Sequence, residues 1–251
     1  MKKRWLWQTS VLLAAAGLLA ATAFAAQRPA GDVLALMYHD LAEDGADETQ
    51  LSPWRTTPAH LREDLQTILS AGYAPLSVEA YAAGEYDPGR DYCIVTFDDG
   101  YTSNLTLAEP VLRELGVPAS VFVITSMVGE AGHMTWEELR RLSDGGVFTV
   151  YSHTHTHSRA DCVSAEAFLQ DAERSWAHLE ARGFSGCRAV FSFPHGAYTE
   201  ESLAALAEAG CRLLLLQQDV RGVGDAVRIL VRLNAAPGMD WGEVLARRRT
   251  G

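Results

Sequence analysis

Short apolar runs alternate with amphipathic segments along most of the chain. The apolar runs are four to six residues long and rich in Val, Ile, Leu and Phe. Runs of this length and composition are typical of buried strands. We expect strands at residues 33–37, 93–97, 119–124, 147–151, 190–193 and 213–216.

The segments between these runs have helical spacing. Leu61, Leu65 and Ile68 fall on one face of a segment that opens with Thr57 as N-cap and Pro58 as the first helical residue. We expect helices at residues 58–71, 107–115, 165–182 and 200–209, and a further helix after the capping-box pattern Thr135-Trp136-Glu137-Glu138.

Strand–helix alternation without repeats or long linkers predicts one α/β domain with a parallel sheet, either open and doubly wound or closed into a barrel. In both folds, ligand chemistry lies beyond the carboxyl ends of the strands. Residues with side chains that can take part in catalysis or bind a metal should therefore come directly after the apolar runs. Four of the expected strands are followed by such residues: His39, the pair Asp98 and Asp99, the 153–157 segment, and His195.

The 153–157 segment contains three histidines, and His153 and His157 are four residues apart. On a helical turn or in a tight loop this spacing places two imidazoles on one side, with His155 directed elsewhere. Together with one carboxylate they would leave coordination positions open, as a catalytic Zn²⁺ needs. The alternatives are surface histidines in a polar loop and a solvated Asp-Gly turn after Asp98.

This arrangement predicts metal-assisted hydrolysis of an amide or an ester. The carboxylate that does not bind the metal would accept a proton from water, and His39 would protonate the leaving amine. A backbone N–H in the turn around His195 would hold the developing oxyanion. The spacing alone does not say which of Asp98 and Asp99 takes which role.

Three motifs resemble those of the polysaccharide deacetylases, carbohydrate esterase family 4. They are Thr96-Phe97-Asp98-Asp99-Gly100, the His-x-x-x-His of residues 152–157, and Phe193-Pro194-His195-Gly196, where the family usually has Pro-Tyr-Gly. The resemblance covers about residue 32 to residue 236. It implies a distorted (β/α) barrel of about seven parallel strands, as a single catalytic domain over residues 32–245.

The resemblance also implies roles. Asp98 would be the general base, and Asp99, His153 and His157 would bind the metal, usually zinc, with Co²⁺, Fe²⁺, Mn²⁺ or Ni²⁺ as other possibilities. Segments 37–40, 72–73 and 232–234 resemble the biofilm-type poly-N-acetylglucosamine deacetylases, in which the acid histidine is N-terminal, here His39. The expected reaction is N-deacetylation of such a polymer. An O-acetyl esterase and a non-catalytic carbohydrate-binding protein are the alternatives.

Two departures from the family pattern affect the site. Ser192 stands where the family usually has an arginine that orients the base, and His195 replaces the usual tyrosine. Arg232 is a candidate substitute for the missing arginine. Trp54, Trp136, Trp176 and Trp241 could stack on sugar rings or belong to the core.

Residues 1–25 have the basic start, apolar stretch and Ala-Phe-Ala end of a signal peptide, so we expect an exported protein, periplasmic or extracellular; an uncleaved membrane anchor is the alternative.

The net charge of −11 disfavours binding to nucleic acid and suits a polysaccharide partner. Membrane exopolysaccharide machinery is a possible second partner, and we expect a monomer. In an exported chain, Cys93, Cys162, Cys187 and Cys211 could form disulfides, Cys187 with Cys211 for example, or remain free thiols.

Overall fold

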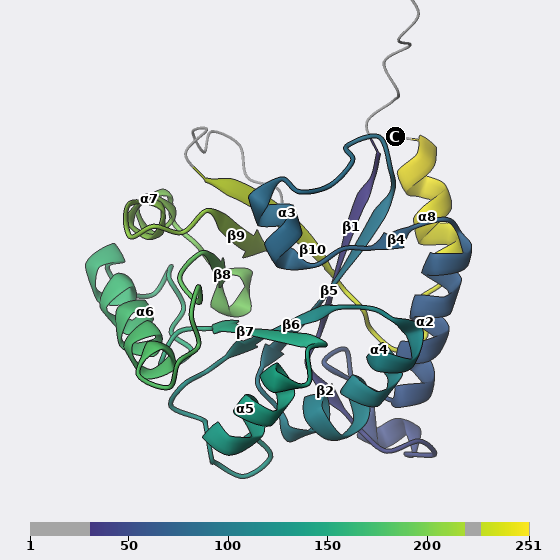
Figure 1. The fold of residues 1–251 in the computed structure, drawn as a ribbon, viewed down its shortest axis with the longest axis horizontal. Coiled ribbons are helices and arrows are strands. Elements are labelled where there is room, and N and C mark those ends of the chain that lie inside the picture. The colour runs from purple at the N-terminus through teal and green to yellow at the C-terminus, as the bar shows by residue number, and fades with distance from the viewer. Residues whose placement is uncertain (1–30, 219–226, 251) are drawn as a thin grey trace, which may run out of the picture.

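The computed structural model describes residues 31–218 and 227–250. Seven parallel strands close into a barrel in the order β1-β10-β9-β8-β7-β6-β5, with β5 pairing back to β1 (Figure 1). The barrel strands are β1 (Val33–Tyr38), β5 (Tyr92–Asp99), β6 (Ala119–Val123), β7 (Phe148–Ser152), β8 (Val190–Ser192), β9 (Leu213–Leu216) and β10 (Arg228–Asn234). The expected (β/α) barrel is confirmed.

Helices surround the barrel, with α2 beside α4 and α8 on one side and α6 beside α7 on another (Figure 1). The helices are α2 (Pro58–Ser70), α3 (Val78–Ala83), α4 (Glu109–Leu115), α5 (Trp136–Asp144), α6 (Ala165–Glu180), α7 (Glu200–Glu208) and α8 (Trp241–Thr250). Short elements complete the chain: β2 (Asp40–Leu41), β3 (Arg55–Thr56), β4 (Ala74–Pro75), a π-turn at Asn104–Ala108, and 3-10 turns at Glu48–Gln50 and Pro194–Gly196.

The helix signals in the sequence act locally as predicted, with one correction. The Thr57 hydroxyl accepts the His60 N–H at the start of α2, and Thr135 forms a capping box at the start of α5. The helix expected from residue 107 is instead a π-turn that passes into α4 at Glu109. Pro110 has no N–H to donate to the preceding turn, which interrupts the regular ladder there.

The barrel strands are buried on both faces because helices cover the outside and side chains fill the inside. Along β1, Leu34 and Leu36 belong to the cluster that packs against the helices, whereas Ala35 belongs to the barrel interior. This explains why the strands read as unbroken apolar runs. Interior positions on β5 then lead from Ile94 through Thr96 to Asp98 at the rim.

The sequence analysis missed the strand that closes the barrel. In β10, the buried interior positions are Leu230 and Arg232. A fully buried arginine interrupts the apolar alternation by which a strand is recognised. The pairings of β10 with β1 and β9 place Arg232 inside the barrel, with its guanidinium 5.7 Å from the Phe122 ring.

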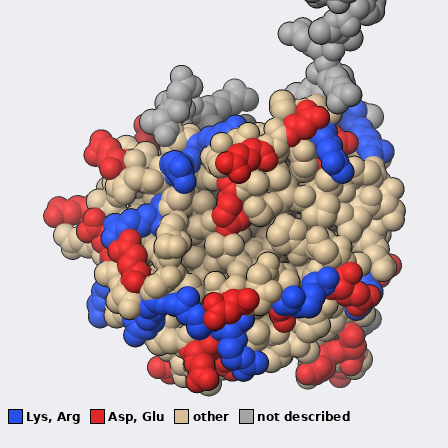
Figure 2. All heavy atoms as spheres, viewed as in Figure 1, with Lys and Arg blue, Asp and Glu red and all other residues tan. Residues whose placement is uncertain are grey.

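The expected signal peptide, residues 1–25, lies outside the described residues. Within residues 31–218 and 227–250, no helix is both long enough and apolar enough to span a membrane. All four cysteines are free; Cys162 is exposed and the other three are buried. Figure 2 shows positive and negative side chains intermixed on the face drawn, with no broad patch of one sign.

Candidate metal and catalytic site

The chemistry-bearing residues lie at one rim of the barrel. Asp98 and Asp99 are the last two residues of β5, and His39 follows β1 directly. His153 and His157 lie in the loop after β7, and His195 lies in the turn after β8. This is the carboxyl-end rim predicted from the sequence.

Asp99, His153 and His157 converge on one point. The Asp99 Oδ1 atom is 3.7 Å from His153 Nε2 and 3.6 Å from His157 Nε2. Ligand atoms about 2.1 Å from one tetrahedral zinc are roughly 3.4 Å apart, so these separations suit a shared ion. Asp99 Oδ1 is buried and accepts no hydrogen bond within the described chain, which leaves it available as a ligand.

Backbone strain is concentrated at this point. The non-glycine residues with positive φ in the described chain are Asp99 (73°), Thr154 (65°), His157 (61°) and His195 (59°). The left-handed region is costly for residues with a Cβ and is often used at functional sites. The turn at Asp99 lets both carboxylates reach His153, and each has one oxygen 3.7 Å from His153 Nε2. The Thr154 hydroxyl accepts the His157 N–H at 2.8 Å, which holds the loop.

The surroundings of both histidines favour the neutral imidazole, which is the form that can bind a metal. His153 Nδ1 lies 2.9 Å from the Ser192 carbonyl, which can only accept, so Nδ1 carries the hydrogen and the Nε2 lone pair faces Asp99. Burial lowers the pKa of His153 to about 3 and that of His157 to about 4. His155 is not part of this group; its Nδ1 lies 2.9 Å from the Thr125 hydroxyl and its ring stacks on His178.

Two neutral imidazoles and an unpartnered carboxylate oxygen therefore form a donor set that fits a divalent cation. Nitrogen and oxygen donors in this combination suit Zn²⁺, and they also accept Fe²⁺, Co²⁺, Ni²⁺ or Mn²⁺. Burial and then the charge of Asp98 raise the pKa of Asp99 to about 7. A cation beside Asp99 would oppose that shift and favour its ionised form.

Asp98 is held by Arg232 from inside the barrel. Arg232 NH1 donates to Asp98 Oδ1 and NH2 to Asp98 Oδ2, each at 2.7 Å, and NH2 also donates to the Ser192 hydroxyl at 2.7 Å. Burial alone would raise the pKa of Asp98, but the charge and hydrogen bonds of Arg232 hold it well below its usual range. The guanidinium missing at position 192 is thus supplied from β10, as hypothesised from the sequence.

His39 and His195 complete the rim. His39 Nδ1 is buried without a hydrogen-bond partner in the described chain, and the Asn104 amide donates to the His39 carbonyl at 2.7 Å. Burial lowers the pKa of His39, whereas the charge of Asp98 opposes that shift.

The His195 ring is exposed, and its centroid lies 4.3 Å from that of the His157 ring. In this turn the Gly196 N–H donates to the Phe193 carbonyl, whereas the His195 N–H has no partner among the described residues.

A protein-family model described as polysaccharide deacetylase matches residues 85–214. The chain belongs to the polysaccharide deacetylase family. Membership supports hydrolase activity on an acetylated polysaccharide and agrees with the motifs at Asp98, His153 and His195.

Individual relatives show how far this likeness extends. A protein of Bacillus subtilis strain 168, called putative polysaccharide deacetylase YxkH, is 25% identical over 81% of this chain and 71% of its own length. The poly-beta-1,6-N-acetyl-D-glucosamine N-deacetylase of Escherichia coli K12 is 27% identical over 50% of this chain. The protein of the same name from Staphylococcus aureus MSSA476 is 24% identical over 47% of this chain. These matches cover 21% of the E. coli protein and 45% of the S. aureus protein.

Solved structures of deacetylases share the fold. IcaB from Ammonifex degensii superposes with a TM-score of 0.72 at 23% identity, over 87% of this chain and 97% of that one. The Streptococcus pyogenes deacetylase PplD, solved in complex with acetate, gives a TM-score of 0.73 at 20% identity, over 87% and 98%. The architecture is therefore common to proteins of low sequence identity.

Two neighbours of the site were not singled out from the sequence. Trp54 meets the His39 ring edge to face, with ring centroids 4.9 Å apart. Tyr101 stacks on His133, and burial and the charge of Asp99 raise its pKa to about 12. Trp54 appeared in the sequence analysis only as one of several tryptophans, because nothing in its local pattern separates a rim residue from a core residue.

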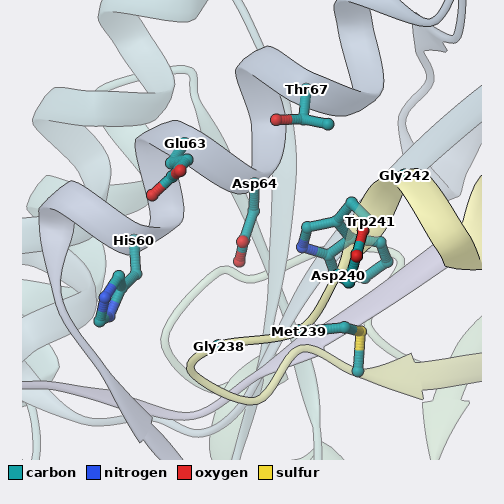
Figure 3. Close-up of a pocket in the computed structure, with 9 residues that line it drawn as sticks. All are labelled: His60, Glu63, Asp64, Thr67, Gly238, Met239, Asp240, Trp241 and Gly242. Carbon is teal, nitrogen blue, oxygen red and sulfur yellow. The ribbon is translucent and has the colours of Figure 1, made fainter.

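The structure also contains a pocket of about 360 Å³ between α2 and the loop before α8. It is lined by His60, Glu63, Asp64, Thr67, Gly238, Met239, Asp240, Trp241 and Gly242 (Figure 3). None of the expected site residues lines it. Asp64 in this pocket accepts the Tyr38 hydroxyl at 3.0 Å, which ties α2 to β1.

Proposed function

We propose that this protein is a zinc-dependent N-deacetylase of a polymer of N-acetylated amino sugars, similar to poly-N-acetylglucosamine. The proposal rests on one observation: two adjacent carboxylates have different partners. Asp98 is kept charged by Arg232, while Asp99 faces two neutral imidazoles. A protein that only bound carbohydrate would need neither arrangement.

The residues at the rim divide the reaction between them. A zinc ion held by Asp99, His153 and His157 would supply Lewis acidity toward the acetyl carbonyl and toward a bound water. Asp98, with its Oδ2 3.7 Å from His153 Nε2, accepts the proton of the attacking water. The His195 N–H donates to the developing oxyanion, because the next N–H of the turn is already occupied.

His39 donates a proton to the leaving amine nitrogen. It directly follows β1, the strand beside β5, in which Tyr38 pairs with Phe97, and its charge interacts with that of Asp98. The negative charge of Asp98 supports the protonated imidazole, whereas burial opposes it, so the proton can leave readily. The amine is a poor leaving group without that proton, so an acid on this side is required for an amide substrate.

The choice of polymer rests on two kinds of support. The E. coli and S. aureus relatives are named for poly-beta-1,6-N-acetyl-D-glucosamine, and the segments around Met37-Tyr38-His39 and Arg232 resemble that group. An acidic chain also suits a product that becomes cationic as free amines appear.

The test is acetate release by the zinc-reloaded protein from N-acetylglucosamine oligomers and, separately, from an O-acetylated polysaccharide. An Asp98→Asn protein that still binds zinc is the control for the base. Zinc-dependent release from the oligomers, absent in that control, is the expected result. Release from the O-acetylated polymer alone would overturn N-deacetylation. No release from either, with zinc bound and the fold intact, would overturn the enzymatic proposal.

We also propose that the protein is exported, on the basis of the signal-peptide pattern of residues 1–25. Cell fractionation followed by N-terminal sequencing tests this directly. A mature chain that starts near Ala26 outside the cytoplasm is expected, and a full-length chain in the cytoplasm would contradict the proposal.

A further inference from the structure

One large apolar side chain at the rim is exposed where most others are covered. Trp54 is 49% exposed, and the other large apolar residue that is exposed in the described chain is Val163. Trp176 and Trp241 are buried, and Trp136 is covered by the Arg182 guanidinium, 3.8 Å from its ring. An indole left open to water costs solvation free energy, so its position calls for an explanation.

The backbone around Trp54 is fixed by contacts with the barrel. The Trp54 carbonyl accepts the Asp40 N–H at 3.1 Å, and the Pro53 carbonyl accepts the Asn234 side chain at 2.8 Å. The next residue, Arg55, pairs with Asp40 at 2.9 Å and lies in β3, which pairs with β2. The backbone at Trp54 is therefore attached to β2 and to the end of β10, and its exposure is not that of a loose loop.

The exposed indole borders the catalytic rim. Its ring meets the His39 imidazole at a centroid distance of 4.9 Å and an interplanar angle of 71°. His39 in turn interacts electrostatically with Asp98 and His157. The indole therefore borders the imidazole that, under the proposed function, would protonate the leaving amine.

We propose that Trp54 is a substrate-binding residue that stacks on a pyranose ring of the polymer next to the acetyl group being removed. This inference rests on the proposed function. A pyranose offers an apolar C–H face to an aromatic ring and hydroxyls at its edge. The Asp40–Arg55 pair beside Trp54 is partly exposed and offers both an acceptor and donors for those hydroxyls.

The competing explanation is that Trp54 only holds His39 in place through the edge contact. The two explanations differ in what they do to binding. A stacking residue lowers the KM for a long substrate and strengthens binding even when no reaction occurs. A residue that acts only through His39 changes kcat and leaves the affinity for the polymer unchanged.

The experiment compares Trp54→Ala with Trp136→Ala, which removes an indole that the Arg182 guanidinium covers. Acetate release is measured with N-acetylglucosamine and with its pentamer. The affinity for the pentamer is measured by calorimetry in the zinc-loaded Asp98→Asn background, with and without Trp54→Ala. Loss of one aromatic contact should raise the KM and the dissociation constant for the pentamer about five- to tenfold. The preference for pentamer over monomer should fall by a similar factor, whereas Trp136→Ala should change neither.

An unchanged dissociation constant together with a fall in kcat on both substrates would overturn the proposal and assign Trp54 to the positioning of His39. A Trp54→Phe protein should keep most of the affinity, which separates loss of stacking from misfolding. If the parent protein releases no acetate at all, the proposed function fails. The calorimetric comparison would still report whether Trp54 binds the sugar.

Discussion

Replacing Arg232 tests how the buried base is kept charged and aligned. Arg232 and Asp98 are 1% and 2% exposed, and the guanidinium gives one hydrogen bond to each carboxylate oxygen. Arg232 also donates to the Ser192 hydroxyl and, at 3.1 Å, to the Thr96 hydroxyl. Arg232→Met keeps much of the side-chain volume and removes all of these donors.

The expected loss has two parts. Removing one member of a buried ion pair leaves an uncompensated charge and lowers the free energy of unfolding by about 3–5 kcal/mol. Without Arg232, burial is less opposed, so the pKa of Asp98 rises and its carboxylate loses its fixed orientation. Loss of a positioned base lowers kcat by about 10²–10³-fold. Arg232→Lys restores the positive charge but not the bidentate hydrogen bonding to Asp98, so it should give an intermediate kcat.

The KM should change little, because Arg232 is buried inside the barrel and cannot touch a polymer. Zinc content should also be retained, since the hydrogen bonds of Arg232 go to Thr96, Asp98 and Ser192 and not to the three proposed metal ligands. Steady-state acetate release, zinc analysis and urea unfolding of the zinc-free protein measure the three quantities. The matched control is Arg62→Met, which breaks a surface pair with Glu114.

A second variant guards against simple misfolding. Arg232→Met combined with Asp98→Asn removes both charges and should be more stable than Arg232→Met alone. The reasoning is refuted if Arg232→Met keeps the parental kcat, or if it is destabilised no more than Arg62→Met.

Three further outcomes are expected. His153→Ala should lose zinc while His155→Ala retains it, because His155 is turned toward Thr125; equal zinc loss in both variants would contradict the assigned ligands. Burial raises the pKa of Asp64 above the ordinary value, so the folded chain holds that proton more tightly than the unfolded chain, and stability is lost as pH rises from about 4. Asp64→Asn should therefore gain stability relative to the parent between pH 4 and pH 7 in urea unfolding; a stability difference from the parent that stays constant over this pH range would contradict the prediction. His195→Gly should be more stable than His195→Ala by about 1 kcal/mol, because glycine tolerates the positive φ there; equal melting temperatures would count against strain in this turn.

Most of the barrel was readable from the sequence because its signals are local. Apolar runs marked six of the seven barrel strands, and the N-caps at Thr57 and Thr135 set helix starts through contacts within a few residues. Parallel strands have a common carboxyl-end rim, so the residues that follow each run could be assigned to one site.

The contacts across the barrel could not be read in the same way. Arg232 meets Asp98 across 134 positions of sequence, from a strand whose buried arginine hides its pattern. The sequence analysis suggested Arg232 only through a family resemblance. Trp54 became distinct from the other tryptophans only once its exposure and its contact with His39 were known.

The sequence by itself determined the elements, their alternation and the set of residues placed at the rim, because periodicity, caps and motif spacing act over a few residues. The tertiary structure decided which carboxylate is held by an arginine and which faces two imidazoles. That choice depends on barrel closure by β10 and on the left-handed backbone at Asp99 and His157, which long-range packing imposes.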